Sequence, residues 1–164
     1  MQRLLMTTIA VAALVAACSS GAVVVTPAPS DPPASPSAAA ARTSVNVTLQ
    51  EFAIIPDVAS VPAGTVTFVA KNTGPDDVHE LVVVKSDLGA ANLPVNKDGK
   101  ATEDVPGVTL IGEIEDIDVG ATKQADLQLT PGKYVLICNI VQTEPDGSLE
   151  AHYKVGMRTD FEVK

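Results

Sequence analysis

The chain has 164 residues, enough for one domain of ordinary size with a substantial hydrophobic core. It carries 20 acidic and 11 basic side chains, for a formal net charge of −9, with three phenylalanines, two tyrosines and no tryptophan. This composition argues against nucleic-acid binding, which needs basic patches and stacking rings. An acidic surface suits either a basic protein partner or simple solvation, and solvation is the default.

The first 17 residues have the pattern of a secretory signal. A basic start, Met1-Gln2-Arg3, precedes an apolar run that is too short and wrongly flanked to remain as a membrane-spanning helix. The run ends in Leu14-Val15-Ala16-Ala17-Cys18, which resembles the lipobox of bacterial lipoproteins, in which the cysteine is acylated. We therefore predict a signal peptide over residues 1–17 and a lipid anchor on Cys18. The anchor would hold the protein on the extracytoplasmic face of the cell membrane, periplasmic or at the cell surface.

Two other interpretations of Cys18 are open. An ordinary signal peptide cleaved nearby would leave it as a free thiol, which is a liability in an oxidising compartment. A disulfide to Cys138 would instead tie the N-terminal segment to a central strand. If Cys18 carries lipid, Cys138 is left without a partner and needs another role.

Residues 18–44 are predicted to be a disordered tether. From Ser19 onward this segment is almost entirely Ala, Pro, Ser, Thr, Val and Gly, without hydrophobic periodicity, and it cannot bury a core. At ~3 Å per residue, the tether would let the folded domain stand roughly 80 Å from the membrane. The folded domain is then expected over residues 45–164.

The rest of the chain is predicted to form β-structure. Alternating or continuous apolar runs bounded by turn residues predict strands at 45–49, 65–70, 78–85, 114–119, 122–129, 133–138 and 157–163. About seven short strands of this kind indicate an all-β sandwich or small barrel. The polar stretch Asp87–Gly107 is predicted to be a long loop with a turn at Lys97-Asp98-Gly99-Lys100, and a short helix near 88–92 stays open.

The candidate metal ligands form a short inventory. Beyond Cys18, the chain after the signal contains only His79, Cys138, His152 and Met157 among histidines, cysteines and methionines. Singly, each has an ordinary structural explanation. His79 could be a histidine of the core or its rim, and His152 a surface histidine. Cys138 could be a small buried hydrophobic residue, and Met157 could fill a gap in the core. Together, two imidazoles, a thiolate and a distant thioether form the ligand set of a blue-copper electron-transfer site. We therefore predict one type 1 copper ion.

Several motifs resemble the cupredoxin family over nearly all of residues 45–164. They are Phe52-Ala53-Ile54-Ile55-Pro56, Val61 to Phe68, Asn72-Thr73-Gly74 before His79, Pro131-Gly132-Lys133-Tyr134 before Cys138, and His152 to Met157. The resemblance implies a Greek-key β-sandwich of seven to eight strands with one type 1 copper at one end. It maps the family's first histidine onto His79, its cysteine onto Cys138, its second histidine onto His152 and its axial methionine onto Met157.

Two features depart from the family pattern. Thirteen residues separate Cys138 from His152, where many small cupredoxins have two to four, and they include a turn-like Glu144-Pro145-Asp146-Gly147. Glu80 stands where many relatives have asparagine. We therefore expect unusual hydrogen bonding around the ligands, with Asn139 and the backbone of residues 72–74 as candidate partners.

The predicted function is one-electron transfer between redox partner proteins by a membrane-tethered monomer. The alternative is a copper-binding or delivery protein without redox turnover, which the same ligands would serve. An enzyme is disfavoured, because copper enzymes of this kind need further histidines and a Ser-His-Asp triad would have to borrow His79 or His152. Zinc in the same site and a fold without metal remain further alternatives.

Overall fold

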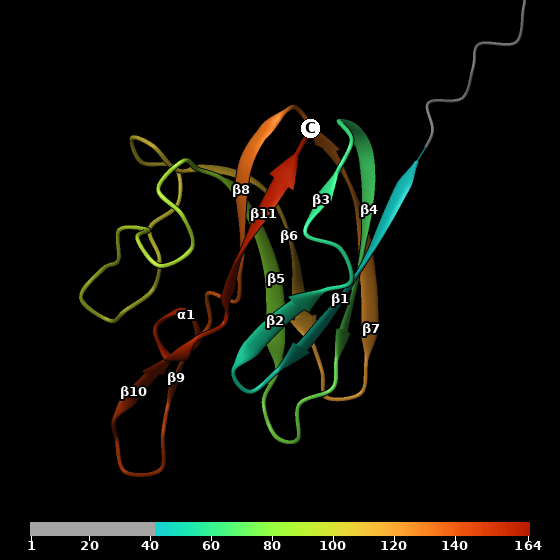
Figure 1. The fold of residues 1–164 in the computed structure, drawn as a ribbon. Helices are drawn as coiled ribbons and strands as arrows, with labels where there is room; N and C mark the ends of the chain where they lie inside the picture. The colour runs from blue at the N-terminus through green and yellow to red at the C-terminus, as the bar shows by residue number, and fades with distance from the viewer. Residues whose placement is uncertain (1–41) are drawn as a thin grey trace, which may run out of the picture. The chain divides into compact units, whose positions relative to one another are not determined.

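The computed structural model describes residues 42–164; the predicted signal peptide, Cys18 and the tether up to residue 41 lie outside the described residues. The described part contains eleven strands and one four-residue helix, and two sheets stack face to face (Figure 1). The prediction of an all-β sandwich is confirmed. Within residues 42–164 no helix is long and apolar enough to cross a membrane.

The first sheet has four strands in the order β2-β1-β4-β7, namely Ala53–Pro56, Thr43–Gln50, Gly64–Asn72 and Thr122–Leu129. β1 pairs in parallel with β4, while its pairing with β2 and the pairing of β4 with β7 are antiparallel. β1 begins at Thr43, because Thr43 and Ser44 pair with β4; these two residues had been assigned to the tether.

The second sheet has five strands in the order β3-β11-β8-β5-β6, namely Ser60–Val61, Arg158–Val163, Gly132–Ile137, His79–Lys85 and Thr109–Ile117. A separate hairpin is formed by β9 (Val141–Thr143) and β10 (Leu149–Ala151), and it leads into α1 (His152–Val155). The predicted turn at residues 144–147 joins the two hairpin strands, as Glu144 N–H donates to Ser148 O and Gly147 N–H to Glu144 O.

The main core lies between the two sheets. Alternate residues of β1 and β4 are buried against residues of β5, β8 and β11, and the rings of Phe68 and Phe161 meet edge to face at 5.7 Å. Cys138 and Met157 belong to this same core. Two of the candidate ligands therefore lie in the hydrophobic interior of the sandwich.

A second core lies on the outer face of the five-stranded sheet, under the loop of residues 86–108. Its buried members are Val82, Val84, Ala90, Leu93, Ala101, Val108, Val135, Ile137 and Tyr153. Residues 88–92, for which the sequence left a short helix open, form no helix. They form turns, with Gly89 at φ +81° and the Asn92 side chain donating to Leu88 O. The predicted turn at Lys97–Lys100 is confirmed, with Gly99 N–H donating to Asn96 O.

Candidate metal centre

Three elements bring His79, Cys138 and His152 together. His79 is the first residue of β5, Cys138 follows the last residue of β8, and His152 opens α1. All three side chains are 0 % exposed. His79 Nδ1 and His152 Nδ1 lie 3.3 Å apart, and Cys138 Sγ lies 3.3 Å from His152 Nδ1 and 3.9 Å from His79 Nδ1. The structure therefore brings together three of the four residues predicted as ligands.

The size of this triangle fits a metal ion. A triangle with sides of 3.3, 3.3 and 3.9 Å has a circumscribed circle with a radius of about 2.0 Å, close to first-row bond lengths of ~2.0–2.1 Å to nitrogen and ~2.3 Å to sulfur. One point between the three atoms therefore lies at bonding distance from all of them. Two imidazoles and a thiolate in a trigonal arrangement are consistent with one type 1 copper ion.

Met157 is connected to the same residues through the backbone. Its N–H donates to His152 O at 2.9 Å, and its carbonyl accepts from Cys138 N–H at 3.0 Å. The side chain is 0 % exposed in the main core. These two bonds link the backbone of Met157 to that of Cys138 on one side and His152 on the other. The axial role of the Met157 thioether stays a prediction.

The tight turn after α1 depends on Gly156. Its φ is +134°, and a Cβ at this position would lie 2.9 Å from the Phe52 carbonyl oxygen. Glycine is therefore required for both the backbone conformation and the close approach. The Phe52 ring meets the His152 ring edge to face at 5.5 Å, so the same approach helps to enclose the imidazole.

Burial sets the protonation of the three ligands. It lowers the pKa of His79 and His152, against the opposing charges of Glu51 and Asp77, so both imidazoles are neutral at pH 7. Burial raises the pKa of the Cys138 thiol to about 12. Without a metal the sulfur is protonated, and an ion that binds at Sγ displaces one proton.

Glu51 lies beside the second ring nitrogen of His79, Nε2. One carboxylate oxygen, Oε1, accepts from Asp77 N–H at 2.8 Å and lies 3.5 Å from His79 Nε2. Burial alone would raise the pKa of Glu51, but the N–H groups of Asp77 and Asp76 lower it overall. No local sequence pattern predicts this contact, because Glu51 follows β1 and lies far along the chain from His79.

The segment that leads into His79 is held by Asn72, the last residue of β4. Its Nδ2 donates to Asp77 O at 2.7 Å and to Ile117 O at 2.9 Å, and its Oδ1 accepts from Gly74 N–H at 2.9 Å. Residues 72–74 were predicted to contribute through their backbone. In the structure the Asn72 side chain provides most of this bracing.

Glu80 and Asn139 connect the neighbouring strands beside Cys138. Glu80 Oε1 accepts from Asn139 N–H at 2.9 Å, and Glu80 N–H points at Cys138 Sγ at 3.5 Å. The Asn139 amide is bonded to both backbone groups of Ala101 and to Glu103, so it ties the ligand segment to the 86–108 loop. Burial raises the pKa of Glu80. Glu80 and Asn139 therefore both contact the segment that carries Cys138, and their effect on a redox potential stays a prediction.

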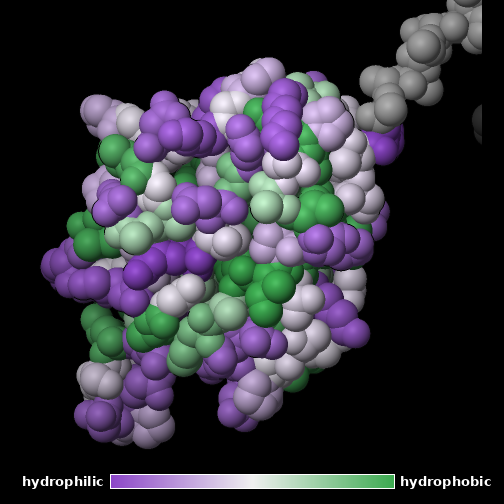
Figure 2. Space-filling model, viewed as in Figure 1, coloured by the Kyte–Doolittle hydropathy of each residue, from purple (hydrophilic) through white to green (hydrophobic). Residues whose placement is uncertain are grey.

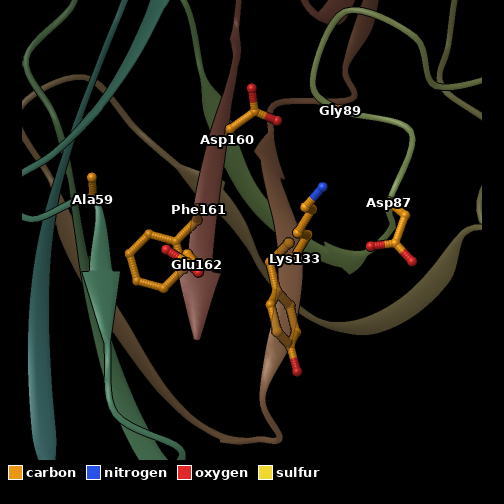
Figure 3. Close-up of a pocket in the computed structure, with 8 residues that line it drawn as sticks. Ala59, Asp87, Gly89, Lys133, Asp160, Phe161 and Glu162 are labelled. Carbon is orange, nitrogen blue, oxygen red and sulfur yellow. The ribbon is translucent and has the colours of Figure 1, made fainter. Parts of the chain in front are cut away.

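An open groove of about 440 Å³ lies elsewhere on the described surface, between the start of the 86–108 loop and strands β8 and β11 (Figure 3). Lys133 extends between Asp87 and Asp160 in this view. None of His79, Cys138, His152 and Met157 lines the groove.

The family described as cupredoxin-like domain matches residues 7–150. No curated protein sequence matches the chain.

Similar solved structures include two of rusticyanin and one of auracyanin. Reduced rusticyanin is 17 % identical with a TM-score of 0.51, covering 75 % of this chain and 79 % of that one. Rusticyanin from Thiobacillus ferrooxidans is 16 % identical with a TM-score of 0.50, covering 75 % and 77 %. Reduced auracyanin from the photosynthetic bacterium Roseiflexus castenholzii is 22 % identical with a TM-score of 0.47, covering 75 % and 96 %.

At these identities the rusticyanin structures support the fold alone. The family match covers most of the chain, and the described residues form the sandwich with three candidate ligands gathered within its interior. The chain therefore belongs to the family of cupredoxin-like domains.

Proposed function

We propose that this protein is a one-electron carrier that holds one type 1 copper ion. His79 Nδ1, Cys138 Sγ and His152 Nδ1 would be the equatorial ligands, with Met157 as the weak axial ligand. The observation that carries this proposal is the fully buried triangle of ligand atoms, whose size matches a single metal ion. Rusticyanin, which shares the fold, is described as a copper protein, and this supports the choice of metal.

The bound ion would supply a Cu(II)/Cu(I) couple, and thiolate, thioether and imidazole together suit both states. The chain contributes rigidity around it. Cys138 N–H, Met157 and His152 form one run of backbone hydrogen bonds, and the Asn72 side chain braces the segment before His79. Because the ligands are buried and held from three directions, little rearrangement is expected when an electron arrives or leaves.

The alternative of copper delivery predicts easy release of the ion. Complete burial of the three ligands favours retention instead. The test is repeated reduction with ascorbate and oxidation with ferricyanide in the presence of a Cu(I) chelator. A carrier should take up one electron per protein in every cycle and keep its copper. Loss of the ion to the chelator in the reduced state would contradict electron transfer and support delivery.

Membrane attachment through Cys18 is part of the same proposal and is supported by the lipobox-like run of residues 14–18. A lipid-anchored monomer outside the cytoplasmic membrane would exchange electrons with redox partner proteins rather than turn over a substrate. The test is fractionation of cells that express the native chain or Cys18→Ser. The native protein should be found with the membranes and the variant in the soluble fraction, and a membrane-bound variant would contradict lipid anchoring.

A further inference from the structure

A second group of possible metal ligands includes His152 but not the other two residues of the triangle. Asp77 from the segment before β5, Glu150 from β10 and His152 each offer one ligand atom, and these three atoms lie within 4.8 Å of one another. The imidazole is fully buried, while both acidic side chains are only half-buried and reach solvent. The group therefore lies between the buried ligands and the protein surface.

The second ring nitrogen of His152 is the atom that fits this group. Nδ1 is engaged with Cys138 Sγ and His79 Nδ1, each at 3.3 Å. Nε2 is buried and has no hydrogen-bond partner among the described residues. A buried N–H without an acceptor is unfavourable, so a partner is expected at such a nitrogen. The nearby carboxylates supply the charge that would draw a cation to it.

The two carboxylates lack a cationic side chain of their own. Within residues 42–164, neither Asp77 nor Glu150 forms a salt bridge with lysine or arginine. In the space-filling view the tip of the hairpin formed by β9 and β10 is largely hydrophilic (Figure 2). A divalent cation would neutralise the pair.

We infer that Asp77, Glu150 and His152 Nε2 form a second divalent-cation site. One imidazole nitrogen and two carboxylate oxygens, completed by water, suit a borderline first-row ion such as Zn²⁺ better than Ca²⁺ or Mg²⁺, which prefer oxygen ligands alone. Binding displaces the Nε2 proton, which passes to solvent, so the imidazole bridges two ions when copper is bound at Nδ1. The hairpin inserted between Cys138 and His152 thus has a specific role, because it supplies Glu150.

One consequence, a change in the properties of the bound copper, rests on the proposed copper site. A cation on Nε2 withdraws electron density from His152 and adds positive charge beside the copper ligands, and both effects favour Cu(I). The reduction potential should therefore rise, and the absorption band of the copper site should shift, when the second site is filled. The protein would then respond to the concentration of a divalent cation.

The test uses the copper-loaded full chain titrated with Zn²⁺ alone. We expect one zinc ion per protein with copper retained, release of about one proton, a higher reduction potential and a shifted visible band. Asp77→Asn and Glu150→Gln should each weaken zinc binding at least tenfold. Glu144→Gln, on the same hairpin but outside the group, is the matched control and should bind zinc as the native chain does.

Three results would overturn the inference. They are the absence of zinc binding beyond exchange with copper, a zinc affinity in Asp77→Asn and Glu150→Gln that equals that of the native chain, and zinc binding that leaves the copper potential and spectrum unchanged. A wrong copper assignment is recognised separately, because the blue band would then be missing before zinc is added. In that case the zinc stoichiometry and the effects of Asp77→Asn and Glu150→Gln still decide the second site.

Discussion

Asn72→Ala should strongly destabilise the metal-free protein. The side chain is 0 % exposed and forms three hydrogen bonds, to Asp77 O, Ile117 O and Gly74 N–H. Alanine would leave two carbonyls and one amide without these partners, in a space too enclosed for all three to be solvated. These bonds hold together β4, the turn after it and the segment that enters His79.

The magnitude follows from the number of bonds. Each hydrogen bond contributes a net ~1 kcal/mol, more where the partner left behind stays buried and less where water reaches it. Loss of the three bonds should therefore lower the free energy of unfolding by about 3 kcal/mol. For a folded part of this size, that corresponds to a fall of roughly 10 °C in Tm. Urea unfolding followed by circular dichroism measures the change, and the dependence on urea should keep its slope.

Thr73→Ala is the matched control. Thr73 is the next residue, is exposed, and its hydroxyl donates one long hydrogen bond of 3.2 Å to Leu49 O. Its loss should cost less than ~1 kcal/mol. If Asn72→Ala were as stable as Thr73→Ala, the bracing assigned to the Asn72 side chain would be wrong.

The remaining predictions concern the ligands and their surroundings. Cys138→Ala should abolish the blue band, because the thiolate provides the charge transfer; a persistent band on the absorption spectrum would refute the ligand assignment. Met157→Leu should retain copper and raise its reduction potential in voltammetry, since a weak donor to Cu(II) is removed, and a lower potential would count against the axial role. Glu80→Asn should change the potential or the spectrum, because Glu80 joins the backbone beside Cys138; unchanged values would show that this contact is unimportant. Burial lowers the pKa of His79 and His152 in the folded protein, whereas the same imidazoles in the unfolded chain keep the ordinary histidine pKa of about 6.5. Below that pH the unfolded chain therefore binds more protons than the folded protein does. The metal-free protein should therefore lose stability as the pH falls below about 6.5, by up to ~1.4 kcal/mol per pH unit for each imidazole, and His79→Gln should reduce this slope in urea unfolding.

The sequence was sufficient to name the candidate ligands because histidines, cysteines and methionines are so few. With two histidines in the chain, any site with two imidazoles must use His79 and His152. The strands that carry or flank the ligands also have clear apolar patterns, as in β5 and β11. Alternation in β11 predicted that Phe161 and Val163 face the core, and both are buried.

Short elements and distant contacts were not predictable in the same way. Strands β2 and β3 have four and two residues, too few for a periodic pattern, and β6 begins at Thr109, before the predicted start at residue 114. Residues 110–112 of β6 are all half-buried, so alternation there is weak. Each of these strands is defined by pairing with a partner elsewhere in the chain.

The burial of His152 shows the same limit. Its local sequence is polar, which alone suggested a surface residue, yet its side chain is 0 % exposed. Its N–H donates to Ile140 O, and the preceding β9–β10 hairpin fixes where α1 begins. The contact of Glu51 with His79 likewise joins residues that no local pattern connects.

The most direct test of the copper site is to add one equivalent of Cu(II) to the full chain and record its visible absorption and EPR spectra. A type 1 site should give stoichiometric binding, an intense blue band and narrow copper hyperfine splitting, with the colour removed by ascorbate and restored by an oxidant. Copper that binds without the blue band, or no binding at all, would contradict a type 1 site formed by His79, Cys138, His152 and Met157.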